Sequence, residues 1–176
     1  MKKLFLFIWE IVKISIIALI IVVPIRIFVF QPFFVRGASM EPNFHDFDYL
    51  IVDEFSYRLS EPQRGQVIVF YNPNDTSKRF IKRVIGLPGE TVKIEHGQVM
   101  VKQESDFFVL DESEYLPKGL ATFGNIELPL GDDQYFVLGD NRNVSFDSRS
   151  FGLLDSKLII GKSAFRLWPI SVFASK

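Results

Sequence analysis

The longest apolar run of the chain lies at its N-terminus, in MKKLFLFIWEIVKISIIALIIVVPIRIFVF. Twelve residues without a formal charge separate Lys13 from Arg26, and further apolar residues extend the run on both sides. About 20 mostly apolar residues are enough to span the hydrocarbon core of a bilayer. Residues 1–30 are therefore predicted to form a short tip and a transmembrane anchor, and residues 31–176 a separate domain outside the bilayer.

Two alternatives to an uncleaved anchor are a cleaved secretory signal and a buried core helix. A cleaved signal ends in a site of small residues, but Phe-Gln-Pro-Phe-Phe follows this apolar run. A core helix rarely carries Ile, Leu and Val on every face. We therefore favour the anchor. Lys2 and Lys3 favour a cytoplasmic N-terminus, whereas Arg26 and Arg36 weaken that bias.

Composition excludes several classes of chemistry. The chain has no cysteine, so disulfides, thiolate nucleophiles and cysteine metal sites are excluded. It has only two histidines and no HExxH spacing, so we expect no metal and no cofactor. The net charge of −1 gives no indication of a nucleic-acid partner.

The sequence after Gln31 changes to short segments rich in β-branched and aromatic residues, bounded by Gly, Pro, Asn and Asp. This pattern is typical of strands, which we expect at residues 48–55, 66–71, 79–86, 91–95, 98–102, 134–140 and 157–168. His96-Gly97 fits a two-residue hairpin turn, and residues 103–133 read as a less regular insertion. The predicted fold class is mainly β, with the N-terminal helix followed by twisted antiparallel sheets.

Ser39, in GASMEP, lies soon after the apolar run and is a candidate nucleophile. A serine hydroxyl is a weak nucleophile unless a base removes its proton. His96 is expected at a hairpin tip, and nothing in the spacing orients His45 as a triad requires. A GxSxG motif is also absent, so a histidine base is disfavoured.

A lysine is the alternative base, because burial disfavours the ammonium form. If RFIKRVIG is a strand, Lys82 shares one face with Phe80 and Val84, and Arg83 points to the other face. Both cations have apolar neighbours, so the pattern does not decide which is buried. Arginine stays protonated in proteins, so Lys82 is the candidate base. Alternatively, both are edge-strand charges that block aggregation.

Three segments, GASMEP, RFIKRVIGLPGE and GDNRNVSFDSRSFG, resemble in order and spacing the motifs of bacterial type I signal peptidases. The resemblance covers roughly residues 4–170 and is closest to the short, single-anchor form common in Gram-positive bacteria. It implies a signal-peptidase-like β domain and a membrane-bound serine endopeptidase. Such an enzyme removes N-terminal signal peptides after small residues, as in A-x-A, through a Ser/Lys dyad and an acyl-enzyme.

The resemblance also implies roles for individual residues. Ser39 would be the nucleophile and Lys82 the general base. Ser145 would hydrogen-bond the lysine, and Asp147 and Arg149 would form a supporting ion pair.

At Gly37 the chain departs from relatives that have a serine there to bind the oxyanion. The oxyanion hole would then rest on backbone N–H groups, chiefly that of Ser39. Val35, Met40 and Ile81 are candidates for a shallow substrate pocket, although they could equally be ordinary core residues.

The implied partners are preprotein signal peptides and the lipid bilayer, with a secretion translocon acting upstream. The implied location is the bacterial cytoplasmic membrane, spanned once, with the N-terminus in the cytoplasm and the catalytic domain on the outer face. The C-terminal FRLWPISVF is expected to be a last core strand, or else a segment that contacts lipid.

Two rival functions remain. A self-cleaving Ser/Lys repressor would carry a DNA-binding domain in place of the membrane segment. A catalytically inactive, membrane-anchored β module that binds exported proteins is the other alternative.

Overall fold

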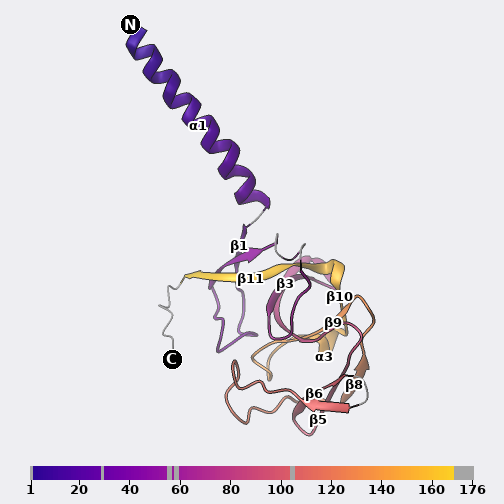
Figure 1. Cartoon of the computed structure of the whole chain (residues 1–176). Helices are drawn as coiled ribbons and strands as arrows, with labels where there is room; N and C mark the ends of the chain where they lie inside the picture. The colour runs from indigo at the N-terminus through magenta and orange to yellow at the C-terminus, as the bar shows by residue number, and fades with distance from the viewer. Residues whose placement is uncertain (1, 29, 55–56, 58–59, 104–105, 169–176) are drawn as a thin grey trace.

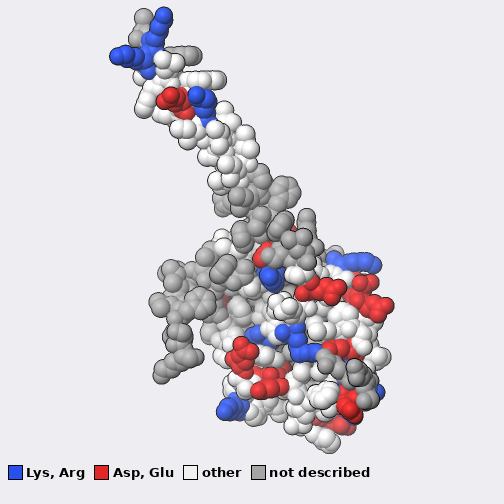
Figure 2. Space-filling model, in the orientation of Figure 1, with Lys and Arg blue, Asp and Glu red and all other residues white. Residues whose placement is uncertain are grey.

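A computed structural model describes residues 2–28, 30–54, 57, 60–103 and 106–168 (Figure 1). Helix α1 (Lys2–Phe28) projects away from a β domain. Its segment Lys2–Val22 is 21 residues long, has a mean hydropathy of 2.5 and is not buried by the domain. The charged side chains drawn on α1 gather near its N-terminal end (Figure 2). By length and composition this helix is suited to cross a membrane.

Two antiparallel sheets form the domain, and the strands of the larger sheet lie in the order β1-β2-β11-β3-β4-β9-β10. Its strands are β1 (Phe30–Phe34), β2 (Tyr49–Asp53), β3 (Val67–Asn72), β4 (Asp75–Gly86), β9 (Gln134–Leu138), β10 (Leu154–Asp155) and β11 (Ile159–Trp168). A short helix, α3 (Ser148–Phe151), and a 3-10 turn, η1 (Ser156–Leu158), lie between β9 and β11. The expected C-terminal strand is confirmed as far as Trp168, and the rest of FRLWPISVF lies outside the described residues.

The smaller sheet has the order β7-β6-β5-β8. Strands β5 (Thr91–Glu95) and β6 (Gln98–Gln103) form the predicted hairpin. Positive φ angles of 52° at His96 and 78° at Gly97 match a two-residue primed turn.

The expectation that residues 103–133 are irregular is wrong in part. Strands β7 (Asp106–Val109) and β8 (Ile126–Pro129) lie in that segment and form the two edges of the smaller sheet. Each has only four residues, and most of their side chains are exposed. Such short edges carry a weak alternation pattern and depend on pairing with β5 and β6.

Strand β4 occupies the centre of the domain, between β3 and β9. Three apolar clusters surround it: Ile81 joins the cluster with Val35 and Met40, Val84 joins a second, and Ile85 joins the core beneath the smaller sheet. Alternate side chains of β4 thus enter different parts of the core. The second half of β4 is buried, so Lys82 and Arg83 lie inside the protein, whereas Lys78 and Arg79 in its first half are exposed.

Candidate active site

Ser39 and Lys82, 43 positions apart, meet in the structure. Ser39 follows β1 on a turn entered through Gly37, whose φ is 87°. Lys82, only 3% exposed on β4, donates a hydrogen bond of 2.7 Å to Ser39 Oγ and one of 2.9 Å to the Ile81 carbonyl. Burial lowers the pKa of Lys82 to about 8, while the negative charges of Asp147 and Asp140 oppose that shift.

The histidines lie elsewhere. His45 is exposed, and its backbone N–H donates to Asp48 Oδ2. His96 is exposed at the β5–β6 turn. In the described part of the chain, the hydrogen bond to Ser39 Oγ comes from Lys82.

The edge-strand interpretation of Lys82 and Arg83 is wrong, because β4 is central and both side chains are buried. Arg83 is paired with Asp140 through contacts of 2.8 Å from Nε and 2.6 Å from a terminal nitrogen. Its guanidinium also donates to the Gly65 carbonyl and lies 4.0 Å from the centre of the Tyr115 ring. A permanent charge needs such compensation when it is buried.

Lys82 has a different environment from its neighbour. Among the described residues, no carboxylate lies within ion-pair distance of its Nζ. A lysine that is desolvated without a paired carboxylate can lose its proton near neutral pH. Lys82 is therefore suited to exchange a proton with Ser39, whereas Arg83 is suited to a permanent ion pair with Asp140.

The loop from Gly139 to Arg149 carries the other predicted residues. The predicted ion pair is present: Arg149 contacts the buried Asp147 carboxylate at 2.9 Å from Nε and 2.8 Å from a terminal nitrogen. Asp147 also caps α3 and accepts the Gly139 N–H at 3.1 Å. This carboxylate fixes the start of the loop to its end.

Ser145 does not make the predicted hydrogen bond to Lys82: its Oγ is buried and has no hydrogen-bond partner among the described residues. It lies beside Ser39 all the same, because both contact Gly139. A Cβ at Gly139 would come within 2.1 Å of Ser145 Oγ and 2.4 Å of the Ser39 carbonyl oxygen. Glycine is therefore required there. Asn141 adds hydrogen bonds of 3.1 Å to the carbonyls of Ser39 and Ala38.

Ser39 and Lys82 lie in a cleft of about 840 Å³. Its apolar wall includes Ile81, together with Phe33, Phe34, Phe80, Val144 and Phe146. Val35 and Met40 do not line it; they are fully buried in the core cluster that Ile81 also joins. Of the three pocket candidates, Ile81 is the one exposed to the cleft.

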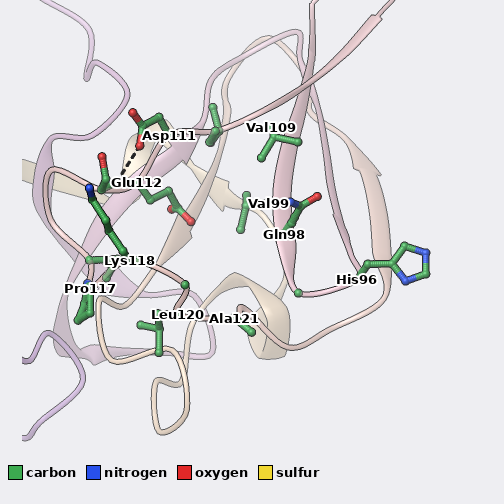
Figure 3. A pocket seen from close by; sticks show the side chains of 15 residues that line it. His96, Gln98, Val99, Val109, Asp111, Glu112, Pro117, Lys118, Leu120 and Ala121 are labelled. Atoms are coloured by element: carbon green, nitrogen blue, oxygen red, sulfur yellow. Dashed lines mark hydrogen bonds between the residues drawn. The ribbon is translucent and has the colours of Figure 1, made fainter.

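A second cleft, of about 550 Å³, lies on the smaller sheet between the β5–β6 turn and residues 111–121 (Figure 3). It contains Glu112 and Lys118, while His96 points outward at its end (Figure 3). None of the residues predicted for the active site lines it. The cleft around Ser39 is therefore the candidate active site.

Asp140 and Arg142 are both buried in the loop Gly139–Arg149, and neither was predicted from the sequence. Their charges stand in the segment GDNR, where Asp and Arg can equally be read as turn residues. Only their burial marks them as part of the site's framework.

Comparisons with known proteins agree on one family. Residues 8–168 match the model described as signal peptidase, peptidase S26. The chain is 37% identical over 166 residues to signal peptidase I of Bacillus amyloliquefaciens, covering 90% of this chain and 87% of that protein. It is 34% identical over 173 residues to signal peptidase IB of Staphylococcus aureus, covering 89% and 87%. A crystal structure of a signal peptidase I from Enterococcus faecalis matches with 30% identity and a TM-score of 0.49, over 60% of this chain and 98% of that one.

Proposed function

The chain belongs to the signal peptidase family S26, and from this membership and the geometry around Ser39 we propose how it cleaves. As a member it is a serine peptidase that removes signal peptides from preproteins. In our proposal Ser39 is the nucleophile and Lys82 the general base. The observation that carries it is the 2.7 Å hydrogen bond between a buried lysine and the serine hydroxyl.

In the first step, neutral Lys82 takes the proton from Ser39 Oγ, and the oxygen attacks the scissile carbonyl carbon. The tetrahedral intermediate collapses, and the leaving amine takes a proton from the Lys82 ammonium. An ester on Ser39 remains. Lys82 then deprotonates a water molecule, which attacks the ester carbon. When the second tetrahedral intermediate collapses, the Lys82 ammonium returns the proton to Ser39 Oγ, and the acyl fragment leaves as a carboxylic acid.

The oxyanion would be bound by the backbone N–H of Ser39, which has no acceptor among the described residues. Gly37 supplies no side-chain donor, and its N–H already donates to Asp46 Oδ1 at 2.8 Å. A correctly oriented backbone donor stabilises charge that develops only in the transition state.

The remaining loop residues have supporting roles. Once Lys82 is an ammonium it has three protons to donate, and Ser145 Oγ, which has no partner among the described residues and lies near Ser39, is a candidate acceptor. Asp147 and Arg149 hold the loop in place and keep a negative charge near the ammonium.

The cleft has apolar walls, although Arg36, Lys78 and Arg79 also line it, and we propose that its apolar part takes the small side chains of the substrate. We assign its floor to Ile81, with Val35 and Met40 packed behind it. This arrangement fits the A-x-A-like specificity that the resemblance implies.

The domain boundary and membrane orientation are also proposals. We divide the chain at about residue 30, where α1 gives way to β1. We place the N-terminus in the bacterial cytoplasm and the β domain on the outer face, because Lys2 and Lys3 lie at the tip of α1. Preproteins delivered by a translocon would then reach Ser39 at the membrane surface.

The test is cleavage of a preprotein with an A-x-A site by membranes that contain wild type, Ser39→Ala or Lys82→Ala. We expect wild type to cut after the second alanine and both variants to be inactive but folded. Full activity of Lys82→Ala would assign the base elsewhere. Binding without cleavage by wild type would favour the inactive β module.

A further inference from the structure

A buried ion pair joins the loop of the active site to the segment that borders the second cleft. The Arg142 side chain is fully buried, and that of Glu112 is 14% exposed. The two terminal nitrogens of Arg142 donate to Glu112 at 3.0 Å and 2.5 Å. One of them also donates to Thr122 Oγ1. This paired, two-point contact has a defined orientation.

Short contacts lead from Arg142 to the dyad. Its Nε donates to the Gly139 carbonyl at 3.0 Å, and its own carbonyl accepts from Arg149 at 2.8 Å. Arg149 holds Asp147, which accepts the Gly139 N–H. Gly139 packs directly against the backbone of Ser39. Arg142 thus fastens both ends of the loop that lies beside the nucleophile.

Glu112 is itself held in place. It accepts a 2.9 Å hydrogen bond from the Tyr115 hydroxyl. The Tyr115 ring lies against the Arg83 guanidinium. The backbone carbonyl of Tyr115 accepts a hydrogen bond of 2.6 Å from Asn43 Nδ2. The carboxylate is therefore a fixed anchor, and it lies at the wall of the cleft shown in Figure 3.

We propose that Glu112 is a positioning residue: through Arg142, which also donates to Thr122, it holds the loop Gly139–Arg149 in register with Ser39 and Lys82. The inference rests on the proposed roles of Ser39 and Lys82. Loss of its charge leaves Arg142 buried without a counter-charge, and the guanidinium must move to find water or another acceptor. The loop moves with it, and small displacements of reacting groups reduce rates strongly.

The test compares Glu112→Gln with two controls in the full-length enzyme. Glu114→Gln makes the same charge change at an exposed position two residues away. Glu90→Gln removes the carboxylate of another partly buried pair, with Arg64, at the β4–β5 turn. For each variant, kcat and KM are measured on an A-x-A preprotein well below the midpoint of thermal unfolding, together with amide hydrogen exchange of residues 139–149.

For Glu112→Gln we expect kcat to fall about 10- to 100-fold with KM changed less than about twofold. Exchange in residues 139–149 should rise. Glu112→Asp should recover part of kcat, and Thr122→Val should lower kcat less than Glu112→Gln while Thr122→Ser does not lower it. Both controls should keep the wild-type kcat.

The proposal is overturned if Glu112→Gln keeps wild-type kcat, or loses no more than Glu90→Gln does. A rise in KM at constant kcat would also overturn it, because it would indicate direct substrate contact. Ser39→Ala and Lys82→Ala, assayed in parallel, distinguish a failure of the proposed Ser39–Lys82 dyad from a failure of the proposed role of Glu112. If either retains activity, the proposed dyad fails whatever Glu112 does; if both are inactive, the Glu112 result stands alone.

Discussion

The two sheets of the β domain differ in where their charged side chains lie: near the surface in the smaller sheet, and partly in the interior in the larger one. The smaller sheet covers a core of apolar side chains that includes Ile85 and Leu138. The ion pairs of Lys93 with Glu95 and Glu127 lie near the surface of this sheet. The larger sheet places Lys82 and Arg83 side by side inside the protein. Burying a charge is costly, so the buried cations of the larger sheet lower its stability, and the proposed chemistry of Lys82 depends on that burial.

Lys82→Met gives the largest expected effect. Loss of the proposed base should reduce kcat/KM by about 10⁴-fold, while the free energy of unfolding stays the same or rises, because an apolar side chain replaces a buried cation. Preprotein cleavage and denaturant unfolding in detergent measure the two quantities. As a control from the smaller sheet, Ile94→Ala should cost about 2–5 kcal/mol of stability and leave kcat unchanged in the folded enzyme. A Lys82→Met enzyme that is less stable than wild type would contradict the comparison.

Asp140→Asn should have the next largest effect, and on stability. It leaves the buried Arg83 guanidinium without its carboxylate, which should lower the free energy of unfolding by about 3–5 kcal/mol. Thermal and denaturant unfolding check this value. Asp132→Asn, at an exposed acid before β9, is the matched control and should change stability by less than about 0.5 kcal/mol. Equal losses for the two variants would mean that burial of the carboxylate does not decide the loss.

The pH dependence of cleavage should follow Lys82. Only its neutral form can accept the Ser39 proton, so kcat/KM should rise with pH and level off above the lysine's pKa of about 8. Each pH unit below that value should cost about tenfold. A flat profile from acid to alkaline pH would rule out a lysine base.

The same titration predicts a trend in stability. Between about 8 and 10.5, the unfolded chain binds a proton at Lys82 that the folded protein does not. The free energy of unfolding contributed by this group therefore increases with pH across that window. Unfolding midpoints measured at several pH values should show the increase in wild type and lose it in Lys82→Met.

Glu127→Gln is expected to have the smallest effect. Its carboxylate is 54% exposed and lies 3.6 Å from Lys93 on the smaller sheet. Exposed pairs contribute little because water and salt screen them. The free energy of unfolding should change by less than about 0.5 kcal/mol, and cleavage should not change. A loss above about 1 kcal/mol would show that surface charges support this sheet more than the comparison allows.

Much of the fold could be predicted because its signals are local. The apolar run marked α1, the alternation of residues 91–95 and 98–102 marked β5 and β6, and His96-Gly97 marked their turn. Strands β1, β7, β8 and β10 were not predicted. All four lie at the edges of the two sheets and have two to five residues, and such short edges owe their structure to neighbouring strands rather than to their own pattern.

The residues of the candidate site also fall into two groups: those that the sequence could predict and those that only the structure identifies. Ser39, Lys82 and the Asp147–Arg149 pair could be named from sequence, because each stands in a short motif whose chemistry or family resemblance is specific. The roles of Asp140, Arg142 and Glu112 could not, because charged loop residues look alike until their burial is known. The sequence also could not show that Val35 and Met40 lie behind the cleft wall.

The sequence by itself determined an apolar helix long enough to span a membrane, the β class and the absence of cysteine chemistry, and it led to the proposal of lysine rather than arginine as the base. These follow from residue type and local order, which the chain carries without folding. Only the tertiary structure decided that Lys82 is buried with no carboxylate of the described residues within ion-pair distance, while Arg83 next to it is paired with Asp140. The different environments of the two cations depend on segments distant in sequence. Strand β9 pairs with β4, and β9 and the loop after it help to remove both side chains from water.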